Sequence, residues 1–217
     1  MLLRPCLIAA LVSLSACAEP AEASSEAAAR DPNAWTIGPI IRGRNYSVAA
    51  PLHPLPRRGG GWYIDLPSHP GSVHYVTFPH GTLAGKRRIV MRYRIETAPG
   101  VRIEASTAPG TPGTITLYFQ RGRDNWSGRG RFEAYRWYAT FATQSPIRAG
   151  DHVIVAPLDG NWTAVERSSA RTNPVAFRDA IAEADQVGFV LGGGDGYGHG
   201  VYATGRARLI VTDFRIE

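Results

Sequence analysis

The chain has 217 residues, 44% of them hydrophobic, and a formal net charge of +6 at pH 7. This length is ample for one hydrophobic core. All basic residues except Lys86 are arginines, and they are spread along the chain, so the charge does not indicate a nucleic-acid-binding protein. A basic exterior remains compatible with acidic glycans or anionic lipid headgroups as partners.

The first 17 residues, MLLRPCLIAALVSLSAC, have the layout of a secretory signal. Arg4 forms a short basic region, an apolar run covers 7–14, and two small residues precede Cys17. The apolar run is too short to span a bilayer in the mature protein. The tetrapeptide Leu-Ser-Ala-Cys at 14–17 resembles the lipobox of bacterial lipoproteins, which implies that Cys17 is acylated and becomes the new N-terminus.

Acylation at Cys17 would anchor the chain in the lipid bilayer of the cell envelope through two or three acyl chains. Ala18, rather than Asp, follows the cysteine, and by the family's sorting tendency this favours the outer membrane. One alternative is an ordinary signal cut at a nearby small residue, for example after Ala18, and another is a cytosolic N-terminal helix. Cys6 lies within the signal, so we expect neither a disulfide framework nor a cysteine metal site in the mature chain.

Residues 18–34 are mostly Ala, Glu and Ser, with two prolines, and predict a flexible tether. A helix over 21–30 would have nothing to pack on. From Trp35 the pattern changes, and 35–217 is predicted to form a single domain without internal repeats.

Short runs rich in Val, Ile, Tyr, Phe and Thr alternate along this domain with clusters of turn residues. Such spacing predicts an all-β sandwich or barrel. The expected strands cover 35–41, 46–49, 62–66, 72–78, 88–96, 101–106, 114–120, 132–142, 151–156, 161–165, 187–191 and 201–216. The only helix expected in the domain starts at Pro174, carries Val175, Phe177, Ile181 and Ala184 at helical spacing, and ends before Val187.

Three of the expected strands, 88–96, 114–120 and 132–142, alternate apolar and polar residues. A period of two places each set on one side of its strand. If the three strands share a sheet, its outer face would carry Arg92, Arg94, Tyr118, Gln120, Arg136 and Tyr138.

The C-terminal part resembles the end of a galactose-binding-like jelly roll, the fold of many carbohydrate-binding modules. The resemblance lies in Val187-Gly188-Phe189, in the glycine-rich loop that follows, and in Asp213-Phe214-Arg215-Ile216 on the last strand. It implies a jelly-roll β-sandwich over 35–217 with one short helix. A fold of this kind does not by itself determine function.

The predicted outer face offers side chains suited to a sugar. Tyr118 and Tyr138 supply rings for stacking, while Arg92, Gln120 and Arg136 supply hydrogen bonds to hydroxyl groups. The alternative is an ordinary solvated sheet face, where arginine and tyrosine are common.

Trp126 lies in a glycine-rich loop over 120–131 with no apolar neighbours in sequence. An exposed indole is costly unless it meets a partner. It could stack on a saccharide, enter a lipid headgroup layer or fold back onto the domain. Asp124 and Asn125 could form hydrogen bonds beside it.

The loop over 192–200 is rich in glycine and displays Asp195, Tyr197 and His199. It lacks the lysine and the following helix of a phosphate-binding loop. We expect either a long turn between two core strands or, if a cleft lies at the rim of the sandwich, a contribution from Asp195 and His199 to ligand binding.

A structural calcium ion near Asp213 is a further expectation, because related jelly rolls often hold one beside the last strand. The change of apolar register there also suggests a β-bulge at Thr212–Asp213. Only Asp31 stands near the first strands as a further ligand. No histidine spacing supports a zinc site.

These patterns predict a non-catalytic, membrane-anchored lipoprotein that binds a carbohydrate or cell-envelope glycan. One alternative is an assembly lipoprotein that binds another envelope protein through Trp126. Another is a glycan-active hydrolase, whose acid and base would come from Asp124, Asp195 and His199.

Overall fold

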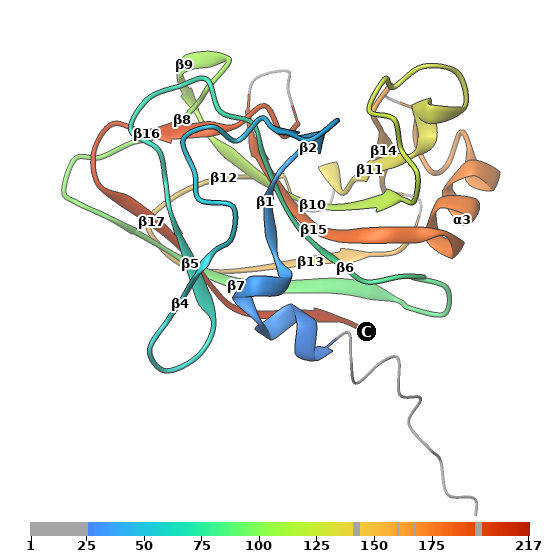
Figure 1. Ribbon diagram of the computed structural model, residues 1–217, viewed down its shortest axis with the longest axis horizontal. Helices are drawn as coiled ribbons and strands as arrows, with labels where there is room; N and C mark the ends of the chain where they lie inside the picture. Colours follow the sequence, from blue (N-terminus) through green and yellow to red (C-terminus); the bar gives the residue numbers. More distant parts are fainter. Residues whose placement is uncertain (1–25, 141–143, 160, 167, 194–196) are drawn as a thin grey trace, which may run out of the picture.

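The computed structural model describes residues 26–140, 144–159, 161–166, 168–193 and 197–217 (Figure 1). The described chain forms an all-β sandwich of antiparallel sheets, as the alternating pattern predicted. Cys17 and the predicted lipobox lie outside these residues. No helix within them is long and apolar enough to cross a bilayer.

The seven-stranded sheet has the order β1-β6-β15-β10-β11-β14, and β12 also pairs with β10. Its strands are β1 (Thr36–Gly38), β6 (His74–Pro79), β10 (Thr114–Arg121), β11 (Arg136–Tyr138), β12 (Ser145–Pro146), β14 (Thr163–Ala164) and β15 (Ala184–Gly192). β10 and β15 pair along almost their whole length, and together they form the centre of this sheet.

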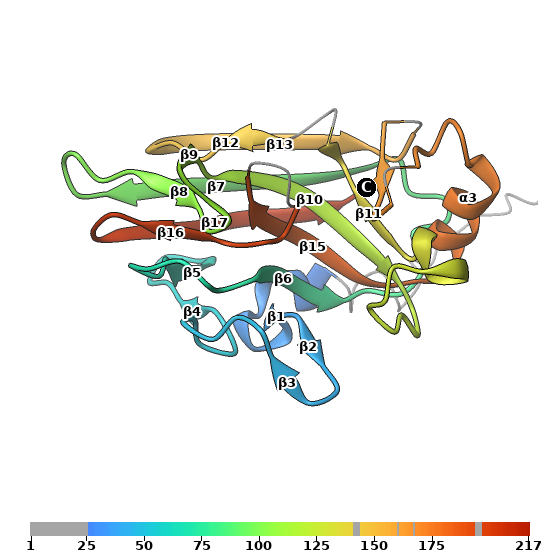
Figure 2. The same cartoon turned by 90° about the horizontal axis from the view of Figure 1, so that it is seen from above.

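The five-stranded sheet has the order β13-β7-β17-β5-β4. Its strands are β4 (Leu55–Pro56), β5 (Trp62–Asp65), β7 (Arg88–Thr97), β13 (Gly150–Pro157) and β17 (Ala207–Ile216). Two small sheets flank the sandwich, one of β8 (Ile103–Ala105), β9 (Ala108–Pro112) and β16 (Val201–Ala203), the other a hairpin of β2 (Ile40–Ile41) and β3 (Arg44–Asn45). The hairpin and β4 lie along one side of the molecule (Figure 2).

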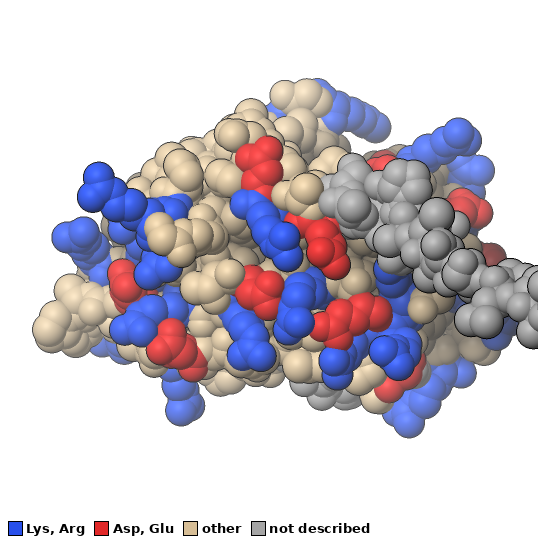
Figure 3. Space-filling view, turned by 90° about the horizontal axis from the view of Figure 1, so that it is seen from below, with Lys and Arg blue, Asp and Glu red and all other residues tan. Residues whose placement is uncertain are grey.

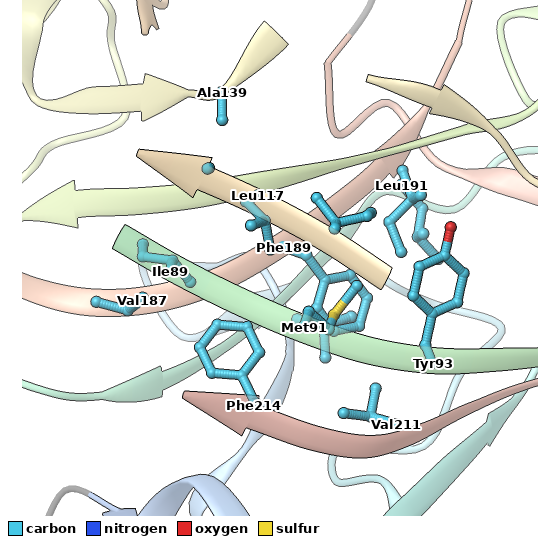
Figure 4. Packing of buried hydrophobic residues seen from close by; sticks show 14 of the residues in the cluster. Ile89, Met91, Tyr93, Leu117, Ala139, Val187, Phe189, Leu191, Val211 and Phe214 are labelled. Atoms are coloured by element: carbon cyan, nitrogen blue, oxygen red, sulfur yellow. The ribbon is translucent and has the colours of Figure 1, made fainter. Parts of the chain in front are cut away.

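The hydrophobic core lies between the two large sheets, where the apolar sets of their strands meet (Figure 4). On β7, Ile89, Met91, Tyr93 and Ile95 are buried while the arginines between them are exposed, as a side-chain period of two requires. Leu117 from β10 and Phe189 from β15 approach from the opposite sheet. The alternation predicted for these strands is therefore confirmed.

The predicted helix is α3 (Pro174–Ala182), which begins with proline at its first position. It covers one end of the sandwich, where Phe177 contacts the rings of Trp137, Trp162 and Phe119. The β-bulge predicted in the last strand is also confirmed, because the register of β17 against β7 shifts between Val211 and Asp213.

Several boundaries differ from the sequence-based expectation. Residues 46–49 form no strand, and the expected strand over 132–142 is short because Gly130–Ala134 forms a 3-10 turn before β11. The expected strand over 201–216 is divided into β16 and β17. Turn-forming glycines and bends separate these segments more finely than the apolar pattern indicates.

The flexible tether predicted for 18–34 is wrong in its second half. Residues 26–30 are helical, and Ala29 is buried against the core. Its carbonyl accepts a hydrogen bond from the indole of Trp35 at 3.0 Å. The expectation failed because the segment has few large apolar residues of its own, but it packs on the core beside Trp35, which is fully buried.

Candidate functional site

The six residues predicted to share one outer face belong to two different sheets. Arg92 lies on β7 of the five-stranded sheet, whereas Tyr118 and Tyr138 face each other across β10 and β11 of the seven-stranded sheet. The expectation of one common face is wrong, because β7 pairs with β13 and β17 and never with β10.

Arg92 instead belongs to a charged outer surface of the five-stranded sheet. Its Nε lies 3.9 Å from Asp213, and that carboxylate also lies 2.8 Å from Arg215. Arg94 lies 2.9 Å from Asp151 on the neighbouring strand. Positive and negative side chains are interspersed in the view of Figure 3. The charges of this surface are largely paired with one another, and the ring of Tyr63 there is covered by the guanidinium of Arg208, which lies 3.8 Å from the ring centre.

Tyr118 and Tyr138 do lie on the side of their sheet opposite the main core, but they are only 0% and 1% exposed. The expected open stacking face is therefore wrong. Two loops cover it: the one over 122–135 brings Trp126, and the one over 192–200 brings Tyr197, whose ring lies 5.1 Å from that of Tyr138. Sequence alternation places side chains on a face but does not show which loops close over it.

Trp126 folds back onto the domain, which was one of its three expected placements. Its ring meets the edge of Tyr75 at 5.1 Å, and the guanidinium of Arg136 lies 4.9 Å from the ring centre. Its backbone N–H donates to Asp124 Oδ1 at 3.0 Å, which holds the tight turn in which Trp126 has a φ of 65°. The side chain remains half-buried, so one part of it still faces solvent.

A buried polar network lies behind this indole. Tyr75 and Tyr138 share a hydrogen bond of 2.8 Å, and Tyr118 donates to Gln120 Oε1 at 2.9 Å. Gln120 in turn donates to Asp124 Oδ2 at 3.1 Å. Each of these polar groups has a partner, as burial in a low-dielectric environment requires. The network fixes the side chains around Trp126 in one arrangement.

Burial dominates the protonation of this cluster. It raises the pKa of Tyr118 and Tyr138 well above the ordinary value, so both hydroxyls stay neutral. Burial also raises the pKa of Asp124, although Arg136 opposes the shift. The two tyrosines can therefore donate or accept hydrogen bonds but carry no charge.

Beside Trp126 a pocket of about 250 Å³ opens on the outer face of the seven-stranded sheet. Four adjacent strands supply its polar side chains: Thr36 from β1, Thr77 and Tyr75 from β6, Gln186 from β15 and Gln120 from β10. Gly38, Pro39 and Ile40 complete the lining. The lining contains hydroxyls, amides and an indole, and no charged side chain.

Gly188 determines how closely two strands of this sheet approach each other. It lies between Thr77 and Tyr118 in the register of the sheet. A Cβ at this position would lie 2.0 Å from the carbonyl oxygen of Val76, far inside van der Waals contact. The Val-Gly-Phe sequence thus allows β6 and β15 to approach closely.

The glycine-rich loop over 192–200 was predicted to supply Asp195 and His199 to a binding site, and His199 does not line this pocket. Asp195 lies outside the described residues, and His199 is exposed. Gly198 packs directly on Tyr75, where a Cβ would lie 2.4 Å from the ring. The described part of the loop therefore acts as a cover over the tyrosines.

The structure assembles no calcium site around Asp213. Arg92 and Arg215 already neutralise its carboxylate, and no group of three or more His, Cys, Asp or Glu residues that could hold a metal occurs among the described residues. Asp31 is part of a helix cap, where it accepts a hydrogen bond from the backbone of Asn33.

A second cavity, of about 320 Å³, lies where β8 and β9 meet the segment before β13. Its lining includes aliphatic side chains such as Val101, Ile103 and Ile147. The carboxylate of Glu104 there accepts hydrogen bonds from Tyr202, Gly110 and Arg102, so its oxygens are already engaged. Unlike the pocket beside Trp126, this cavity has charged side chains in its lining, Arg102, Glu104 and Arg148.

Four residues that supply polar groups to the pocket were not predicted as site residues from the sequence: Thr36, Tyr75, Thr77 and Gln186. Each lies within or next to a predicted strand, and alternation would have placed Tyr75 and Thr77 on one face. Nothing in the sequence indicates that β6 lies next to β15 and β1 next to β6, which is what brings the four together.

A scan against protein-family models found no match, and neither did a search of the curated proteins.

Proposed function

We propose that this protein is a membrane-anchored, non-catalytic lipoprotein that binds a carbohydrate of the cell envelope in the pocket beside Trp126. The observation that carries the proposal is the uncharged lining, which combines the indole of Trp126 with the hydroxyls of Thr36 and Thr77 and the amides of Gln120 and Gln186. A neutral sugar offers apolar C–H faces for an aromatic ring and hydroxyls for such groups.

The lipobox at 14–17 and the galactose-binding-like phrases in the C-terminal part support the same proposal. Asp124 argues against a hydrolase, because its carboxylate is already engaged by Arg136, by Gln120 and by the N–H of Trp126. A carboxylate held in this way has no free position for an acid or base role. Its role in the proposal is to orient the wall of the pocket.

The test begins with a glycan array probed with the full lipoprotein in detergent. The best ligand is then titrated calorimetrically against the parent chain, Trp126→Ala and Gln186→Ala. We expect Gln186→Ala to weaken binding by roughly tenfold, the value of one hydrogen bond, and Trp126→Ala to weaken it further. Val155→Ala, on the exposed edge of the other sheet, should bind as the parent does.

Failure to bind any glycan would refute the proposal. Binding that is equal in all four proteins would place the ligand elsewhere and would also count against the pocket. Thermal melting of each variant separates lost binding from lost folding.

A further inference from the structure

One long stretch of the chain carries positive charge without any acid. Between Asp31 and Asp65 the sequence contains no Asp or Glu, but it contains Arg42, Arg44 and the pair Arg57-Arg58. This stretch builds β1, the β2–β3 hairpin, β4 and the turns between them. This stretch therefore carries four positive charges and no negative side chain.

These four arginines are exposed, and none forms an ion pair with an acidic side chain among the described residues. Only Arg44 has an aromatic neighbour, with its guanidinium carbon 5.0 Å from the ring centre of Tyr46. The arginines of the five-stranded sheet differ, since Arg94, Arg208 and Arg215 each pair with a carboxylate. Unpaired arginines leave a net positive field on their side of the molecule.

The same segment exposes an unusual amount of apolar surface. Of eight large hydrophobic side chains that are exposed in the described chain, five belong to residues 40–55. Val48 is 69% exposed, Leu52 46% and Leu55 42%. Apolar side chains mixed with unpaired arginines are unfavourable in water alone, but they suit a surface that is anionic outside and apolar beneath.

Figure 2 places β2, β3 and β4 along one side of the molecule, next to β1 and the first helical turn of the described chain. We call this side the arginine edge and define it by Arg42, Arg44, Tyr46, Val48, Leu52, Leu55, Arg57 and Arg58. At most eight residues, 18–25, separate Cys17 from the described chain, and they span no more than about 29 Å when fully extended. A lipid on Cys17 would therefore keep the domain close to the bilayer.

We propose that the arginine edge docks on an anionic phospholipid bilayer, with guanidinium groups on headgroup phosphates and the apolar side chains at the headgroup boundary. Arginine suits this role because its planar donors match phosphate oxygens. An arginine near an anionic surface strengthens association about fivefold. The inference goes beyond carbohydrate binding and rests on the proposed lipid anchor for its orientation.

The test uses single-cysteine labelling, because the only native cysteines are Cys6, in the signal, and Cys17. A fluorophore is placed on Val48→Cys in the arginine edge or, as a matched control, on Val153→Cys. Val153 is 52% exposed and lies on β13, at the opposite edge of the five-stranded sheet. Each full lipoprotein is reconstituted into vesicles of equal parts phosphatidylglycerol and phosphatidylcholine with a spin-labelled quenching lipid.

We expect the label at 48 to be quenched and the label at 153 to remain bright. Combining Arg44→Gln, Arg57→Gln and Arg58→Gln should weaken docking roughly a hundredfold and bring quenching at 48 down to the level at 153. Vesicles of phosphatidylcholine alone should have the same effect.

Equal quenching at both positions, no quenching at 48, or quenching that ignores the arginine changes and the lipid charge would overturn the proposal. Crosslinking between two labelled copies at 48 in detergent would instead assign the edge to a second copy of the chain. Intact mass spectrometry shows whether Cys17 is acylated, and it therefore separates failure of the docking proposal from failure of the lipid-anchor proposal. An acylated chain without quenching at 48 refutes the docking surface, whereas quenching of an unacylated chain refutes only the anchor.

Discussion

The guanidinium of Arg136 lies 2.9 Å from Asp124 Oδ2 and 4.9 Å from the ring centre of Trp126. The side chains of this ion pair are 8% and 0% exposed, so solvent hardly screens it. The pair thus joins the sheet, through β11, to the loop that forms the wall of the candidate pocket.

Asp124→Asn should lower the free energy of unfolding by about 3–5 kcal/mol, because it leaves the Arg136 charge buried without its counterion. Asp151→Asn is the matched control. It removes an exposed partner of Arg94 and should cost less than about 1 kcal/mol. Urea denaturation of both variants measures the difference, and equal small losses would show that the Asp124 pair contributes little.

We expect the buried side chain of His74 to make the stability of the fold sensitive to acid. Burial lowers its pKa to about 4, and its Nδ1 accepts the N–H of Val201 at 3.1 Å, while its buried Nε2 has no hydrogen-bond partner among the residues that the structure describes. The unfolded chain takes up this proton near pH 6.5, so stability should be full above that value and fall as the pH drops toward 4. The loss is about 3 kcal/mol for this group.

His74→Asn retains a side-chain acceptor for Val201 and removes the titration. Its free energy of unfolding should vary less between pH 6.5 and 4 than that of the parent chain. Identical pH profiles of the two proteins, measured by urea denaturation, would assign the acid sensitivity to other groups.

Substitution of Gly198 tests whether its loop forms a rigid cover over the cluster of Tyr75, Tyr118 and Tyr138. Gly198 and Gly43 have similar backbone angles, with φ of 70° and 77°. An added Cβ at Gly198 would lie 2.4 Å from the ring of Tyr75, whereas one at Gly43 would face open space. Gly43→Ala should cost about 1 kcal/mol for its left-handed conformation alone. Gly198→Ala should lower the free energy of unfolding by clearly more, and it should shift the fluorescence of Trp126, whose ring contacts that of Tyr75.

Equal losses in the two alanine variants, measured by thermal melting, would mean that the loop moves away from Tyr75 without consequence. A larger loss for Gly198→Ala would support a rigid cover over the cluster.

Glu104 should titrate far below an ordinary carboxyl. Hydrogen bonds from Tyr202, from the N–H of Gly110 and from Arg102 lower its pKa to about 2. Its contribution to stability is therefore present above about pH 4.5 and is lost as the pH falls toward 2. Tyr202→Phe removes the largest cause and should raise the pKa, as followed by NMR of the labelled carboxyl. Tyr135→Phe, whose ring lies against Arg121 instead, should leave it unchanged.

The alternation of apolar and polar residues predicted which side of its strand each side chain occupies, but it did not predict which loops cover that side. Ile115, Leu117 and Phe119 lie in the core as expected, and Tyr118 and Gln120 lie on the other side. The burial of Tyr118 was not predicted, because it depends on Trp126 and on the loop through Gly198, which are distant in the chain. The candidate pocket was predicted only through Trp126 and Gln120.

The sequence by itself determined the all-β character, the place of α3 and the bulge before Asp213. The leader that ends at Cys17 remains a prediction from the sequence. These features depend on local periodicity, on turn residues and on short motifs, which act within a few residues of one another. Tertiary structure alone decided that Arg92 and Tyr118 belong to different sheets and that Thr36, Thr77 and Gln186 meet beside Trp126. Strand pairing is decided by contacts between segments far apart in the chain, and no local pattern encodes which strands become neighbours.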